Sequence, residues 1–130
     1  MENCNFDVSK LMNNQDITVW VKLNKVVDVE VKYVTRQKFA ELARQATKTV
    51  WDRNNQPVET FDNIKFGELL GVETVKDWSG LINDGEILPC TPENITLLMA
   101  RWFDFAKFVS SICTDLERLI ELQKEVERKN

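Results

Sequence analysis

The stretch DITVWVKLNKVVDVEVKYV, residues 16–34, carries a regular apolar alternation. Apolar side chains recur at every second position on both sides of a break at residues 24–25, which is the pattern of two strands that each bury one face. The two series are Ile17, Val19, Val21 and Leu23, then Val27, Val29, Val31 and Tyr33. We therefore predict a β-hairpin over residues 16–34.

The register of this hairpin depends on the length of its loop. A two-residue loop would set Val21 opposite Asp28 and so mix apolar and charged side chains on one face. A three-residue loop over residues 24–26 sets Val21 opposite Val29 and, on the other face, Lys22 opposite Asp28. Because both faces then agree, we predict the three-residue loop.

A helix is predicted directly after the hairpin, over residues 36–51. Thr35 suits its N-cap, because a threonine hydroxyl can accept a hydrogen bond from a free amide of the first turn. Apolar residues then recur at spacings of three and four, as on one face of a helix. They are Phe39, Leu42, Ala43, Ala46 and Val50. We expect this face to cover the valines of the hairpin.

The middle of the chain is less regular. Residues 52–60 are polar and include a proline, so we expect a loop there. A short helix is expected over residues 61–70, with Gly71 as its C-cap. One more helical turn is expected within residues 72–79. Its inward-facing side chains would be Val72, Val75 and Trp78.

Residues 84–93 combine a tight turn with the start of a helix. Asp84-Gly85 lies between two apolar pairs, and glycine accepts the positive φ that tight turns require, so we expect a small hairpin or a looped-out finger. The run Thr91-Pro92-Glu93 offers a hydroxyl N-cap, a proline at the first helical position and an acid near the positive end of the helix dipole. It therefore predicts a helix from residue 92.

The last segment has apolar residues at heptad a and d positions, which is typical of a long amphipathic helix. They are Ile95, Leu98, Trp102, Phe105, Val109, Ile112, Leu116, Leu119 and Val126. A continuous helix to residue 129 would measure ~57 Å at 1.5 Å per residue, which is more than a domain of this size needs. We therefore expect a helical core over residues 35–116, a projecting helix end over 117–130 and a loose N-terminal arm over 1–15.

Two features are candidates for partner binding. The heptad seam either packs along its own domain or serves self-association or capture of another protein, for which the contact residues would be Leu116, Leu119, Ile120 and Val126. Trp20 lies on the hairpin face that also carries Lys22 and Asp28, so it points away from the valines. It either meets a partner, because tryptophan is enriched at interface hot spots, or is covered by the N-terminal arm or another helix. Trp78 and Trp102 are interpreted as core residues.

The composition bounds the class of protein. A chain of 130 residues with 43% hydrophobic and 29% charged residues is typical of a single soluble domain. We expect a cytoplasmic protein, because no stretch approaches the length of a membrane span and residues 1–10 lack the layout of a signal peptide. The net charge of −4 argues against nucleic acid as a partner. The three cysteines, Cys4, Cys90 and Cys113, are widely spaced and are interpreted as reduced thiols.

The sequence carries no recognisable catalytic or metal-binding set. It contains no histidine, which is the commonest general base and a common metal ligand. The carboxylates Asp77, Asp84 and Glu86 lie in a turn-rich segment without a nucleophile, so we interpret them as turn and surface residues. A calcium loop centred on Gly85 would need an acid where Gly80 stands. We expect a non-catalytic protein without cofactor or metal.

Residues 77–94 nevertheless carry a motif. It combines Asp-Trp, a small residue and Gly, an Asp-Gly turn, a Pro, and Thr before Glu-Asn and an apolar helix. The positions are Asp77, Trp78, Gly80, Asp84, Gly85, Pro89, Thr91, Glu93 and Asn94. With the later Phe105 and Phe108, this pattern resembles the tail assembly chaperones of long-tailed bacteriophages over roughly residues 60–115. The chain departs from the family pattern at Ser79, where Glu is frequent, and at Cys90, where an aromatic residue is frequent.

The resemblance implies a non-enzymatic helper in the host cytoplasm. Such chaperones bind the tape-measure protein, keep its helical apolar surfaces from aggregating, recruit tail-tube subunits and leave the finished particle. The alternative is a structural phage or prophage component, such as a connector or capsid-associated subunit, that stays in the virion. The residues themselves predict an α+β domain that is mainly helical, with an N-terminal β-hairpin packed on a helix and a long C-terminal helix.

Overall fold

The computed structural model describes residues 5–129, and the side chains of residues 5–126. The chain has an α+β fold, as the sequence predicts. Its helices are α1 (Ser9–Met12), α2 (Arg36–Gln45), α3 (Asn63–Thr74), α4 (Pro92–Arg101), α5 (Phe103–Cys113) and α6 (Leu116–Lys129). Its strands are β1 (Thr18–Lys22), β2 (Asp28–Lys32), β3 (Thr47–Trp51), β4 (Pro57–Phe61), β5 (Val75–Ser79), β6 (Ile82–Asn83) and β7 (Glu86–Ile87).

The β1–β2 hairpin has the predicted register. Val21 pairs with Val29 and Lys22 pairs with Asp28, so the three-residue loop is confirmed. The Asn24 carboxamide oxygen holds this loop closed, because it accepts hydrogen bonds of 2.9 Å from the amides of both Val26 and Val27.

The hairpin is extended by a third strand, in the order β1-β2-β5. This corrects the helical turn expected within residues 72–79. Val75 pairs with Val31 and Trp78 pairs with Val29, because a bulge between them lets one residue of β2 oppose two of β5. The bulge turns Val75 and Trp78 to the same buried face at a spacing of three residues, which imitates the period of a helix.

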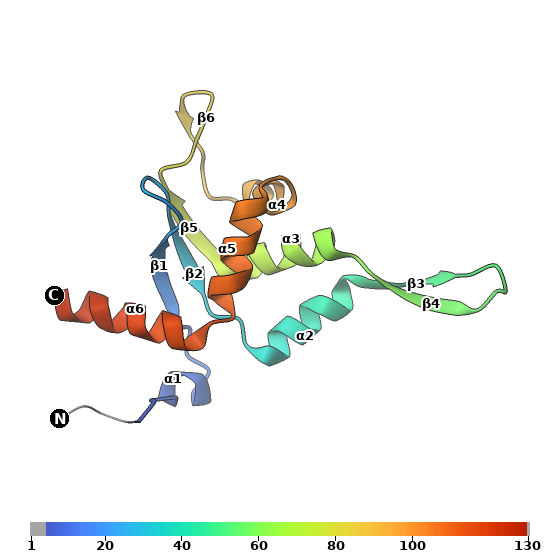
Figure 1. Cartoon of the computed structure of the whole chain (residues 1–130), viewed down its shortest axis with the longest axis horizontal. Helices are drawn as coiled ribbons and strands as arrows, with labels where there is room; N and C mark the ends of the chain where they lie inside the picture. The colour runs from blue at the N-terminus through green and yellow to red at the C-terminus, as the bar shows by residue number, and fades with distance from the viewer. Residues whose placement is uncertain (1–4, 130) are drawn as a thin grey trace.

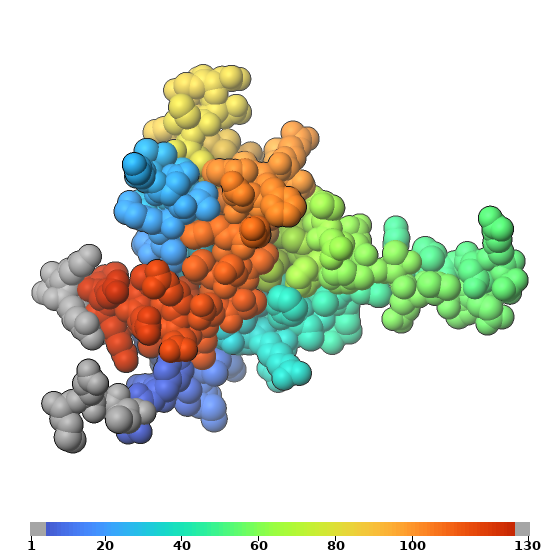
Figure 2. Space-filling model, in the orientation of Figure 1, coloured from blue at the N-terminus to red at the C-terminus, as the bar shows by residue number. Residues whose placement is uncertain are grey.

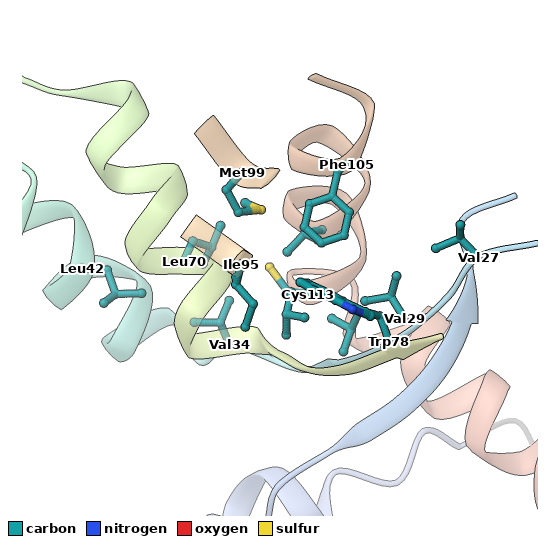
Figure 3. Close-up of a cluster of buried hydrophobic side chains, with 13 residues drawn as sticks. Val27, Val29, Val34, Leu42, Leu70, Trp78, Ile95, Met99, Phe105 and Cys113 are labelled. Carbon is teal, nitrogen blue, oxygen red and sulfur yellow. The ribbon is translucent and has the colours of Figure 1, made fainter. Parts of the chain in front are cut away.

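The core lies on the inner face of this sheet, beneath α3, α4 and α5. Figure 3 shows Trp78, Val29, Phe105 and Cys113 converging there from the sheet and the helices. A second cluster joins the inner face of β1 to α6. The helix expected to cover the valines, at residues 36–51, instead packs chiefly on α3, while α5 contacts β2 and α6 contacts β1.

Residues 47–61 form a second hairpin, which corrects two expectations. Helix α2 ends at Gln45 rather than continuing to residue 51, and β3 and β4 pair across what was expected to be a polar loop. The residues of β3 include β-branched side chains that favour strands, and Asp52 organises the turn by accepting hydrogen bonds from the amides of Asn54 and Gln56. We call this hairpin the β3–β4 arm. It projects from the body of the molecule (Figure 1).

Helix α3 runs past the predicted end at Gly71. A Cβ built on Gly71 would collide with the side chain of Met99 and lie 3.1 Å from Cγ2 of Ile95. The glycine therefore serves the close packing of α3 against α4 and not a C-cap.

The C-terminal segment is helical, but it is divided into α4, α5 and α6 rather than continuous. Trp102 has an extended backbone (φ −108°, ψ 100°) between α4 and α5. The carbonyl of Cys113, at the end of α5, accepts a 2.9 Å hydrogen bond from the amide of Val34, and the Asp115 carboxylate then accepts one from the amide of Arg118 to start α6. These breaks fold α6 back onto β1, so its first half does not project.

Candidate protein-binding surfaces

The motif at residues 77–94 connects the sheet to the helices. Trp78 is buried, its ring meets Phe105 edge-on at 6.0 Å, and its indole Nε1 donates a 2.8 Å hydrogen bond to the carbonyl of Leu88. Asn94 donates from Nδ2 to the carbonyl of Pro89 at 2.9 Å. The Thr91 hydroxyl accepts a hydrogen bond from the amide of Asn94, so the predicted N-cap is confirmed.

The other motif residues also have local structural roles. Asp84 and Gly85 both have positive φ (50° and 83°) and form the predicted tight turn between β6 and β7. The Asp77 carboxylate accepts a hydrogen bond from the amide of Trp78, and Glu93 lies in the first turn of α4. Gly80 has φ 88° and lies against the backbone of Val26. The motif residues thus form turns, caps and packing contacts, and they do not come together at one site.

The predicted contact residues of the C-terminal seam are divided between core and surface. Leu119 has no exposed surface, because it packs against the inner face of β1. Leu116 belongs to the same cluster and Ile120 is half-buried. Val126 is 54% exposed. The apolar residues therefore pack on their own domain along the first turns of α6, whereas Val126 farther along the helix stays exposed.

Trp20 lies on the outer face of the sheet, as predicted. It pairs with Glu30, which pairs in turn with Asp77, so these side chains form a row across the three strands. Trp20 is 43% exposed. Helix α1 is held on α6 instead, where Lys10 Nζ donates to Gln123 Oε1 at 3.0 Å. Trp20 remains a candidate contact for a partner.

The β3–β4 arm exposes apolar side chains along its length. Trp51 at its far end is 66% exposed, and the cross-strand pair Val50 and Val58 is exposed on the opposite face. Figure 2 shows the arm extending beyond the outline of the body, without other described residues packed over it in this view. Isolated two-stranded hairpins are marginally stable in water, so a partner that covers the arm would stabilise it.

An apolar groove lies at the root of this arm. We call it the α3–α5 groove, because it is bounded by the start of α3, the end of α4 and the start of α5, and its volume is about 410 Å³. Its walls include Ile64, Gly67, Phe103 and Ala106. Phe103 is 79% exposed. The ring of Phe66, which also lines the groove, lies 5.4 Å from that of Phe61 at the base of β4, so the apolar surface continues from groove to arm.

The charges at the groove have one sign. Arg101 and Lys107 line it, and the described lining contains no carboxylate. A depression between α2 and α3 differs in this respect, because lysines and glutamates line it together. There Glu73 lies 3.0 Å from Lys32 and 3.9 Å from Lys38.

The two described thiols, Cys90 and Cys113, have raised pKa values. Burial raises the pKa of the Cys113 thiol to about 12, and burial together with the charges of Asp77 and Glu30 raises that of Cys90 to about 11. Both thiols are therefore neutral at pH 7, whereas a nucleophilic cysteine needs a lowered pKa. Within residues 5–126, no three of the Cys, Asp and Glu side chains come together as a possible metal site. Cys4 lies outside the described residues.

Sequence reasoning missed both the arm and the groove. The arm had a signal, since TKTVW and PVETF are rich in β-branched and aromatic residues and flank a turn of Asp and Asn. The helical spacing that includes Val50 obscured it. The groove had no continuous signal, because its residues come from separate helices.

The chain was compared with family models, curated proteins and solved structures, and no match was found. The described helices include none that is long and apolar enough to cross a membrane. The function is therefore inferred from the residues and from the surfaces they form.

Proposed function

We infer that this protein is a non-catalytic phage tail assembly chaperone that acts in the host cytoplasm. Its partner is the tape-measure protein, whose apolar helical segments it covers while tail-tube subunits are recruited. The observation that carries this proposal is the exposed apolar surface that joins Phe61 at the base of the arm to Ile64 and Phe103 at the groove. Surfaces of this kind mark sites of protein association.

The motif residues support the same proposal in a different way. Trp78, Pro89 and Asn94 hold the segment before α4 against the core. A chaperone that shares these residues would share this fold, and it would recognise its partner through other residues. The exposed surface beside α4 and α5 is available for that recognition.

Co-expression with the tape-measure protein of the same phage, followed by pull-down, tests the proposal. We expect the tape-measure protein to be retained and to stay soluble only when this chain is present. Its failure to be retained when both proteins are soluble would contradict the proposal.

The second candidate is a structural subunit that stays in the particle, and the projecting β3–β4 arm favours it. Arms that leave the body of a subunit can lie on a neighbouring subunit, where their free strand edges and apolar faces are covered. Mass spectrometry of purified particles separates the two candidates. A chaperone is absent from the finished particle, whereas a structural subunit is present in stoichiometric amounts.

A further inference from the structure

Nothing in the described part of the chain requires a glycine at Gly67. It lies in the interior of α3, where glycine is a poor helix former. Its backbone is not in the left-handed region, and a Cβ built on it would meet no heavy atom of the described residues within 4 Å beyond its chain neighbours and the adjacent backbone of α3. Gly71, four residues on, differs because Met99 occupies the space beside it. The missing side chain at residue 67 instead deepens the α3–α5 groove, which it lines.

The walls of this groove suit a helix better than a strand or a small molecule. They are helices that offer side chains and no free strand edge, and a glycine on one wall allows another helix to approach closely. Small-molecule sites usually add polar groups that fix the orientation of the ligand. Among the described side chains, no buried polar atom lacks a hydrogen-bond partner that such a ligand could supply.

The charged residues at the groove indicate which charged residues the bound helix should carry. Arg101 and Lys107 are exposed and are not among the described cations within 4 Å of a carboxylate. Two unpaired cations beside an apolar groove, in a chain of net charge −4, favour acidic residues on the partner.

We propose that the α3–α5 groove binds an amphipathic helix of another protein. Large apolar side chains of that helix pack on Ile64 and Phe103 above Gly67, and its Asp or Glu residues face Arg101 and Lys107. The identity of the partner as the tape-measure protein rests on the proposed function. The preference for an acidic amphipathic helix rests on the groove alone.

Two synthetic helices test this preference with the full chain. Both are labelled 21-residue peptides with leucine at the a and d positions, one with glutamate and the other with lysine at the flanking positions. Fluorescence anisotropy should show at least tenfold tighter binding of the glutamate peptide at low salt. The difference should shrink as salt is raised, because exposed charges are screened.

Variants at Gly67 test the depth of the groove. Gly67→Phe should weaken binding of the glutamate peptide at least tenfold, because the ring fills the groove. Gly67→Ala is the matched control and should change binding less than threefold. Both substitutions replace glycine by a better helix former, so loss of folding would not explain the difference. Equal binding by Gly67→Phe and the wild type would overturn the proposal.

Charge reversal tests the rim. Arg101→Glu with Lys107→Glu should abolish the preference for the glutamate peptide. Lys25→Glu with Lys76→Glu changes the net charge equally at exposed positions outside the groove, and it should keep the preference. Loss of preference in both double variants would overturn the proposal by showing that only net charge matters.

The failures of the two proposals are distinguishable. If the wild type and Gly67→Phe retain the tape-measure protein equally, the groove proposal fails and the chaperone function stands. If the glutamate peptide binds in the groove but the tape-measure protein is not retained, the chaperone proposal fails and the groove stands. If light scattering finds a dimer that Gly67→Phe dissociates, the occupant is a second copy of this chain, and the proposal is overturned.

Discussion

At the scale of single residues, Gly80 and Gly85 show how similar backbone angles can carry different energetic weight. Both have positive φ, at 88° and 83°. A side chain at Gly80 would collide with the carbonyl of Val26, whereas one at Gly85 would enter open space. Gly80 thus lets the segment after β5 pass close to the β1–β2 loop, and Gly85 serves only its own turn.

The first prediction compares these two positions. Gly80→Ala should lower the free energy of unfolding by about 3 kcal/mol or more, because left-handed strain adds to a backbone collision. Gly85→Ala should lower it by about 1 kcal/mol, which is the strain alone. Urea denaturation of the two variants measures both. Equal losses would show that the segment after β5 does not lie close to Val26.

The buried thiol of Cys113 predicts a dependence of stability on pH. Its folded pKa is raised from 9.0 to about 12 by burial, so the unfolded state loses this proton first as pH rises. The neutral thiol of Cys113 makes its full contribution to stability below pH 9. The free energy of unfolding should fall as pH rises from 9 toward 12. Denaturant unfolding at a series of pH values checks this. Cys113→Ala should be less stable at pH 7 and should show a shallower decline above pH 9.

Among the helices, α5 and α6 share one apolar spacing but pack in two different places. The apolar positions of α5 pack against β2 and the helices, and those at the start of α6 pack on β1. Apolar spacing predicts which face of a helix is buried, but it does not show whether the helix continues or breaks. The bend at residues 114–115 lets both segments cover the same side of the sheet.

Helix α6 should therefore behave as part of the core. Leu119→Ala should cost about 2–5 kcal/mol of stability, as expected for a fully buried leucine. Val126→Ala, on the exposed part of the same helix, should change stability by less than about 0.5 kcal/mol. Thermal or urea denaturation distinguishes the two. An unaltered stability of the Leu119 variant would mean that α6 is not docked on β1.

For the molecule as a whole, the β3–β4 arm lies outside the hydrophobic core of the body. The described core clusters contain none of residues 48–61, either as buried or as partly buried members. The arm is tied to the body at its root, where the amide of Asp62 donates to the carbonyl of Ala46 at 2.9 Å. A projecting arm of this kind adds little to the stability of the body, and its exposed faces are suited to contact with another chain.

Removal of the arm should leave the body folded. Replacing residues 48–60 by Asn-Gly would join Thr47 to Phe61, which are already paired across the strands. The free energy of unfolding should change by less than about 1 kcal/mol, because no core side chain is lost. Circular dichroism and denaturant unfolding test this. A large loss of stability would show that the arm is part of the cooperative unit.

The local features of this protein can be predicted from its amino-acid sequence alone. The alternation around Val21 and Val29 set the first hairpin and its register, Asp84-Gly85 set a tight turn, and Thr91 set the start of α4. Each depends on neighbours along the chain, so composition and spacing suffice to predict it.

The way in which these parts meet depends on contacts in the folded molecule. Strand β5 forms because β2 offers it a free edge. Its bulge places Val75 and Trp78 on one face three residues apart, so the sequence pattern looks helical. Helix α5 ends where Val34 bonds to Cys113, and the α3–α5 groove combines residues from three helices. Such features depend on hydrogen bonds and packing between residues far apart along the chain, and a local pattern does not encode them.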